Sequence, residues 1–109
     1  MSSQEKKLKL VNLVYENSQK GKLAWEVTAS SEAFQASFPN YFVGIQKDEQ
    51  NYHLDIMNEA GEVVERISST ASSLTTEVLQ SIYTLARGKA MKSDEAIDDL
   101  IDLLSKAKI

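Results

Sequence analysis

The spacing of hydrophobic residues changes twice along this chain. Near the N-terminus, apolar side chains recur every three or four residues, which predicts a helix that ends at Gly21. Six of the eight residues in 8–15 are apolar, more than a helix needs when it buries only a narrow stripe. We therefore expect this helix to pack against the rest of the domain or against a partner.

Between residues 23 and 68 the period shortens to two, which is typical of half-buried strands. Short polar segments separate the strands, and the turn at 58–61 contains Asn58 and Gly61, residue types that tolerate the positive φ of tight hairpins. Five short strands with short connections predict an antiparallel meander. The predicted strands are 23–27, 34–38, 41–47, 52–57 and 63–67.

The helical period returns after a serine-rich loop at 68–73. One helix is predicted over 74–90 and another from Ser93. In the second helix, Asp94 and Glu95 lie at the N-terminal end, where the helix dipole is positive, and Lys106 and Lys108 lie at the C-terminal end, where it is negative. Only a short joint connects these helices, so we expect an antiparallel helical hairpin packed on one face of the sheet. The predicted core face of the last helix consists of Ile97, Leu100, Ile101 and Leu104. The fold class is then α+β, in a single domain over residues 1–109.

The amino-acid composition excludes several kinds of covalent link and metal site. The chain has no cysteine, which excludes disulfides, thiolate nucleophiles and Cys-ligated metals, and its single histidine, His53, excludes a multi-His metal site. Neither a signal peptide nor a membrane span is visible in the sequence. We expect a cytoplasmic protein.

The net charge of −4 is unevenly distributed. Residues 30–72 contain two basic and seven acidic side chains, a net charge of −5, while the segments before and after carry +2 and −1. An acidic strand region disfavours nucleic acid or an anionic membrane as the partner.

Three stretches stand out together: GKLAW at 21–25, NEAGEVV at 58–64, and IYTLAR at 82–87 with AIDDL at 96–100. They resemble a group of small uncharacterised prokaryotic proteins, and modules within larger proteins, that carry no assigned activity. The resemblance spans most of the chain and implies no catalytic residues. It implies a bacterial or archaeal interaction module.

His53 and Asp55 come nearest to a catalytic pair, because residues i and i+2 of a strand point to the same face. A general base oriented by a carboxylate has this arrangement. Since no serine or threonine is marked as a nucleophile, two polar surface residues are the favoured interpretation. A hydrolase or isomerase centred on this pair stays a minor alternative, and we expect no enzymatic activity.

Acidic residues gather in the last helix without the spacing or the glycine turn of a calcium loop. We interpret them as the start and the solvated face of that helix, and we expect neither a metal nor a cofactor. They are Asp94, Glu95, Asp98, Asp99 and Asp102.

Aromatic side chains in the strand region could stack bases if a basic groove accompanied them. Only Lys47 and Arg66 are basic in this part of the chain, so core packing is favoured and single-stranded nucleic-acid binding is the second prediction for function. The aromatic residues are Trp25, Phe34, Phe38, Tyr41, Phe42 and Tyr52.

The first prediction for function is a small non-enzymatic protein–protein interaction or regulatory module that self-associates as a homodimer. Edge strands of the meander or the wide apolar face of the first helix would provide the contact. The alternative is a monomer in which that helix covers the sheet. The predicted contact residues are Leu8, Val11, Val14, Tyr15, Trp25 and Phe42.

Overall fold

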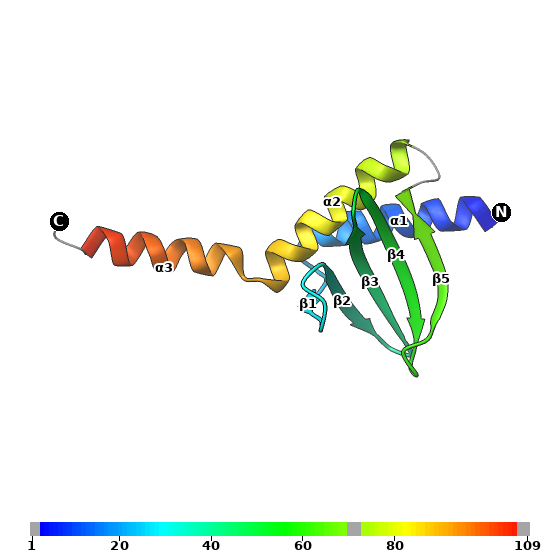
Figure 1. The fold of residues 1–109 in the computed structure, drawn as a ribbon, viewed down its shortest axis with the longest axis horizontal. Coiled ribbons are helices and arrows are strands. Elements are labelled where there is room, and N and C mark those ends of the chain that lie inside the picture. Colours follow the sequence, from blue (N-terminus) through cyan, green and yellow to red (C-terminus); the bar gives the residue numbers. More distant parts are fainter. Residues whose placement is uncertain (1–2, 70–72, 107–109) are drawn as a thin grey trace.

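The computed structural model describes residues 3–69 and 73–106, with the side chains of 73 and 74 left out of the description. In the order of the chain, an N-terminal helix is followed by five strands, which form one sheet, and then by two helices. The α+β class is therefore confirmed (Figure 1). The elements are α1 (Ser3–Gln19), β1 (Glu26–Val27), β2 (Ala33–Phe38), β3 (Tyr41–Asp48), β4 (Asn51–Asn58), β5 (Val63–Ser68), α2 (Ser73–Ala90) and α3 (Ser93–Lys106).

The sheet is the antiparallel meander that the alternating pattern predicts, with the strands in the order β1-β2-β3-β4-β5. The β4–β5 hairpin turns where Asn58 and Gly61 predict it. The Oδ1 atom of Asn58 accepts hydrogen bonds from the backbone N–H groups of Ala60 and Glu62, both at 3.0 Å, and Gly61 has a φ of 83°. The side chain of Asn58 therefore holds the turn by replacing a backbone acceptor.

The core lies between one face of the sheet and the helices α1 and α2. Helix α2 contacts strands β1 to β4, whereas α1 makes its most extensive contacts with α2. The most deeply buried large side chains come from α1, α2 and the helix-facing side of the sheet; they are Val11, Phe34, Ile45, Leu54, Leu79 and Ile82.

The first strand is shorter than predicted, because only Glu26 and Val27 pair with β2. Leu23 and Trp25 precede the strand, and Trp25 is buried, with its indole Nε1 donating a hydrogen bond to the Oγ of Ser18 at 3.0 Å. The alternation at 23–27 thus arises from a connection tied to α1, not from a pleated strand. Part of the predicted 68–73 loop lies outside the described residues.

The end of α1 has the geometry that Gly21 predicts. Gly21 has a φ of 69°, and the backbone N–H groups of Gly21 and Lys22 donate to the carbonyls of Ser18 and Asn17. These two bonds form a Schellman motif, which satisfies carbonyls that a helix end otherwise leaves free.

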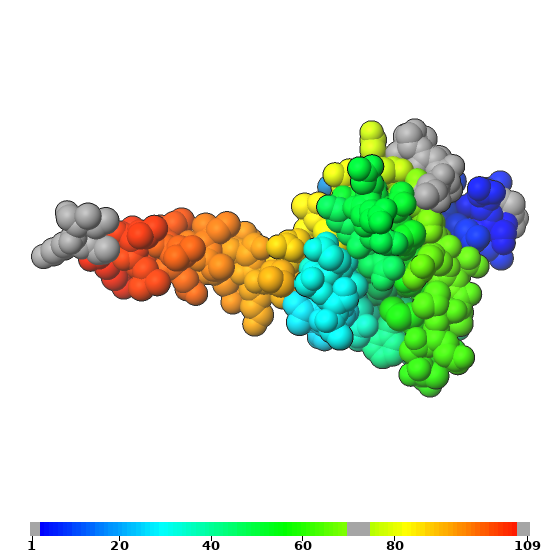
Figure 2. Space-filling model, in the orientation of Figure 1, coloured from blue at the N-terminus to red at the C-terminus, as the bar shows by residue number. Residues whose placement is uncertain are grey.

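The last helix differs from the expected hairpin. Helix α2 packs on the sheet, but α3 continues away from the domain, makes its most extensive contacts with α2, and has no buried residue (Figures 1 and 2). The chain therefore extends 61 Å along its longest axis, and its radius of gyration is 16.1 Å, against about 13 Å for a compact domain of this size. An amphipathic pattern specifies that a helix has an apolar face, but it does not specify which surface covers that face.

The junction between α2 and α3 consists of Met91 and Lys92. The N–H of Met91 still donates to the carbonyl of Arg87, as in a helix, and the carbonyl of Lys92 already accepts from the N–H of Ala96. Lys92 has a φ of 54° and changes the direction of the chain. Two residues can be enough for a helical hairpin, so the direction of α3 follows from the backbone conformation at this junction and not from its length.

Candidate interaction surfaces

Helix α3 presents a continuous hydrophobic stripe to solvent, which we call the α3 apolar face. Its side chains follow the i, i+3, i+4, i+7 spacing of one helix face and are 54–65% exposed. Burying an aliphatic side chain of this kind is worth about 1.5–3 kcal/mol, so an exposed stripe of four favours association. The α3 apolar face consists of Ile97, Leu100, Ile101 and Leu104.

The rest of α3 is mostly acidic, apart from Leu103, which is 65% exposed. Its 14 residues contain five carboxylates and one lysine, a net charge of −4. The lysine, Lys106, forms an exposed ion pair of 3.0 Å with Asp102. Helical spacing places Asp98, Asp99 and Asp102 on the side opposite the α3 apolar face.

A second apolar surface lies between α1 and the end of the sheet near the β2–β3 turn. We call it the α1 groove, a cavity of about 440 Å³, large enough for a few aliphatic side chains. It exists because α1 packs chiefly on α2 and leaves part of the helix-facing side of β2, β3 and β4 uncovered. Most of its wall is formed by Leu10, Leu13, Val14, Phe38, Tyr41 and Ile56.

The α1 groove has a basic border. Residues 3–22 contain five lysines and two glutamates. Lys6 precedes Leu10 by four residues and Leu13 by seven, and Lys9 precedes Leu13 by four, so both exposed lysines share the groove-facing side of α1 with these leucines. The acidic residues of α1 are Glu5, which directly precedes Lys6, and Glu16, three residues after Leu13. Lys7 is already paired with Glu65 of β5 at 3.4 Å.

The structure distributes the contact residues predicted from the sequence over several places. Val11, Val14 and Trp25 are buried in the core, although Val14 also lines the α1 groove. Leu8 is 48% exposed on α1 but lies outside the groove lining. Tyr15 and Phe42 are half-buried, and Phe42 lies on β3. The six residues therefore do not form one surface.

The two edge strands of the sheet differ in length and in the apolar surface that they expose. At one edge, β1 has only two residues, a length that limits pairing with another chain. At the other edge, β5 exposes Val63 and Val64, which are 49% and 53% exposed. The Lys7–Glu65 ion pair ties this strand to α1.

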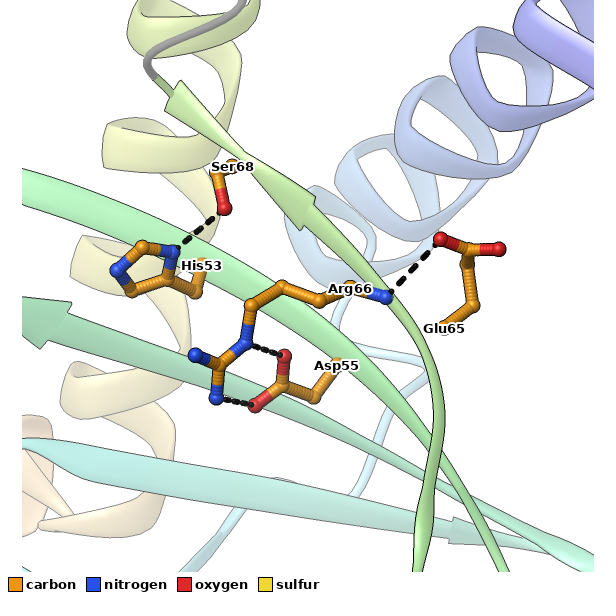
Figure 3. Close-up of polar contacts among 5 residues, drawn as sticks. All are labelled: His53, Asp55, Glu65, Arg66 and Ser68. Atoms are coloured by element: carbon orange, nitrogen blue, oxygen red, sulfur yellow. Dashed lines mark hydrogen bonds and ion pairs between the residues drawn. The ribbon is translucent and has the colours of Figure 1, made fainter.

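His53 and Asp55 point to the same face of β4 but do not interact with each other (Figure 3). Asp55 accepts two hydrogen bonds from Arg66 of β5, at 2.7 and 3.0 Å, and this bonding raises the pKa of Arg66 above its ordinary value. His53 shares a hydrogen bond of 2.8 Å between its Nδ1 and the Oγ of Ser68. The carboxylate thus neutralises an arginine and does not orient the imidazole.

The same face of the sheet has a shallow hollow of about 140 Å³ beside Asp55. It lies over Gly44, the cross-strand partner of Asp55, where the end of the Met57 side chain already occupies the position next to a would-be Cβ, at 3.0 Å. In residues 3–69 and 73–106, no buried side-chain nitrogen or oxygen lacks a hydrogen-bond partner. No group of three or more His, Asp or Glu in those ranges is placed to hold a metal ion.

Tyr83 of α2 has a strongly raised pKa. It is buried against Phe34 and Tyr52, with ring centroids 5.7 and 5.5 Å away, and its hydroxyl donates to Glu32 at 2.7 Å. Burial first, and then this hydrogen bond, raise the pKa of Tyr83 to about 12. A phenol that stays protonated in this way acts as a structural donor, linking α2 to the segment before β2.

The aromatic residues of the strand region do not lie together on one open face. Trp25 and Phe34 are in the core and Tyr52 packs on Tyr83, while Phe38 and Tyr41 line the α1 groove. Base stacking needs neighbouring rings with open faces. This placement does not favour nucleic-acid binding over core packing.

No helix within the described parts of the chain combines the length and the hydrophobicity that crossing a membrane requires. Comparisons with protein-family models, with curated proteins and with solved structures found no match to this chain. The resemblance to small prokaryotic proteins stays a prediction, and the case for function rests on the surfaces above.

Sequence reasoning placed the α3 apolar face in the core and so missed it as a surface. Its amphipathic spacing was visible, and so was the short joint before it. The missing information was the direction of α3, which depends on the backbone conformation at Lys92. The α1 groove left no signal in the sequence, because its α1 wall and its sheet wall are far apart in the chain: 24 residues separate Val14 from Phe38, and 46 residues separate Leu10 from Ile56.

Proposed function

We propose that this chain is a small protein–protein interaction module without an enzymatic activity of its own, and that it self-associates through the α3 apolar face. The observation that carries the proposal is the exposure of four aliphatic side chains on a helix with no buried residue. Large exposed apolar patches on a soluble domain mark interaction sites. An amphipathic helix is also a recurrent docking element, because its anchors enter a groove on the partner.

The face of the sheet that carries His53 and Asp55 supports the non-enzymatic part of the proposal. Arg66 engages Asp55 and Ser68 engages His53, so the pair lacks the arrangement in which a carboxylate orients a base. We also propose a cytoplasmic location, with which the absence of cysteine agrees.

The test is sedimentation velocity of the full chain from low to high micromolar concentration, compared with Leu100→Gln/Leu104→Gln. We expect a dimer for the unchanged chain and a monomer for the variant. Asp99→Asn is the matched control on the opposite side of α3 and should still dimerise. Because no α3 side chain is buried in the domain, the variant should unfold at the same urea concentration as monomeric parent protein. A parent chain that is monomeric throughout, or a variant that still dimerises, contradicts the proposal.

A further inference from the structure

We infer that the α3 apolar face of one copy docks in the α1 groove of a second copy, so that two chains exchange their C-terminal helices. This inference rests on the proposed self-association and names the surface that receives the helix. Both surfaces belong to the same chain, and both are apolar and uncovered. Reciprocal exchange of a terminal element closes a two-fold dimer without a further surface.

Size is the first argument. Helix α3 has 14 residues and is therefore about 21 Å long. The groove wall on α1 runs from Leu10 to Asn17, the same seven-residue span as Ile97 to Leu104, and the opposite wall comes from Phe38, Tyr41 and Ile56. Side chains spaced by three or four residues along α3 can enter such a groove while the acidic side stays in water.

Charge selects the α1 groove over a second α3. Two α3 helices packed together would bring two net charges of −4 side by side. The α1 groove instead has Lys6 and Lys9 at its border, in a segment with more lysine than glutamate. Opposite charges around an apolar contact favour the correct pairing, and like charges penalise the alternative.

The direction of α3 selects a second copy over the same chain. Helix α3 leads away from its own domain (Figure 2). Turning it back toward its own α1 groove would have to occur at Met91 and Lys92. Those two residues are held by hydrogen bonds to Arg87 and Lys89 of α2.

A mixing experiment tests the exchange. Leu100→Gln/Leu104→Gln disables the helix, and Leu13→Glu disables the groove by placing a carboxylate where the acidic helix docks. Leu8→Gln is the matched control, because Leu8 lies on the same helix with a similar exposure, 48% against 45% for Leu13, and outside the groove lining. Each variant is first checked for the circular dichroism spectrum and urea midpoint of monomeric parent protein.

We expect each disabled variant to be monomeric by sedimentation velocity and Leu8→Gln to be dimeric. A mixture of the helix-disabled and groove-disabled variants should form a heterodimer, because one intact helix then meets one intact groove. This heterodimer should be weaker than the parent dimer, since only one of two docking contacts remains.

The other outcomes separate this inference from the proposed function. A parent dimer that survives Leu13→Glu but not the α3 substitutions leaves the proposed function standing and overturns the exchange in favour of pairing between α3 helices. A mixture that stays monomeric also overturns the exchange. A monomeric parent chain overturns both, and protection of α3 amides from hydrogen exchange in that monomer would show a helix folded back on its own chain.

Discussion

The indole Nε1 of Trp25 donates a hydrogen bond to the Oγ of Ser18 at 3.0 Å, and both residues are buried. This bond joins the end of α1 to the connection that leads into the sheet. It also explains why a tryptophan can lie in the core, because a buried N–H without a partner is costly.

Ser18→Ala should lower the free energy of unfolding by about 1–3 kcal/mol, because it leaves the Trp25 N–H buried and unpaired. Urea unfolding followed by circular dichroism measures the change. Ser81→Ala is the matched control, since the Ser81 hydroxyl only donates to the carbonyl of Glu77 on the exposed side of α2. Equal effects of the two substitutions would show that the Trp25–Ser18 bond adds no stability.

The Asp55–Arg66 pair should show a measurable coupling. The carboxylate is 9% exposed and the guanidinium 46% exposed, so removing Arg66 leaves a largely buried charge without a partner. A double-mutant cycle of Asp55→Asn and Arg66→Gln should give a coupling free energy of about 1–2 kcal/mol, after allowance for the half-exposed arginine. The same cycle on Asp102 and Lys106, which are 65% and 75% exposed, should give a coupling near zero, and a similar value for both pairs would refute the prediction.

Tyr83 should make the fold sensitive to alkaline pH. Its pKa is raised from 10.0 to about 12 in the folded chain, so the phenol of the unfolded chain loses its proton first. The resulting stabilisation is fully present below pH 10 and is lost as pH rises to about 12, at no more than about 1.4 kcal/mol per pH unit. The measurement is urea unfolding of the parent and Tyr83→Phe from pH 9 to pH 11.5.

The parent and Tyr83→Phe differ only in one phenol hydroxyl, so the comparison isolates Tyr83. The parent should lose stability more steeply than Tyr83→Phe above pH 10. Parallel curves would mean that the Tyr83 pKa is the same in the folded and unfolded chains.

Two glycines should respond to alanine with opposite signs. Gly21 has a φ of 69°, in the left-handed region that costs other residues about 1–2 kcal/mol, so Gly21→Ala should destabilise. Gly88 lies inside α2, and an added Cβ there meets no atom within 4 Å, so Gly88→Ala should stabilise by about 0.5–1 kcal/mol. Thermal unfolding of the two variants measures these changes, and a shift of the melting temperature in the same direction for both variants would contradict the prediction.

Hydrogen exchange should distinguish α3 from α2. Helix α3 has no buried residue, whereas α2 contributes Leu79, Ile82 and Ala86 to the core. In dilute protein, α3 amides should exchange much faster than α2 amides, because their hydrogen bonds open without disturbing the core. At concentrations where the dimer forms, protection should increase in α3 and in Leu10–Val14; an increase in α3 alone would favour pairing between α3 helices.

The sequence by itself determined the elements and the order of the sheet. Alternation at β2 to β5 and the turn residues Asn58 and Gly61 act over a few neighbouring positions, so they can be read without knowledge of the fold. Gly21 predicted the end of α1 for the same reason. The predicted first strand was too long. Trp25 fits the alternating apolar pattern of a strand, but its side chain is held by a hydrogen bond to Ser18, seven positions earlier in the chain.

Only the tertiary structure decided which apolar faces are covered. Residues 8–15 and 97–104 both have helical spacing, yet α1 contributes to the core and α3 is exposed along its whole length. The difference arises at Lys92, whose backbone conformation directs α3 away from the sheet. The α1 groove likewise depends on where α1 rests on α2. Hydrophobic periodicity is a property of one element, whereas burial is a property of the space between two.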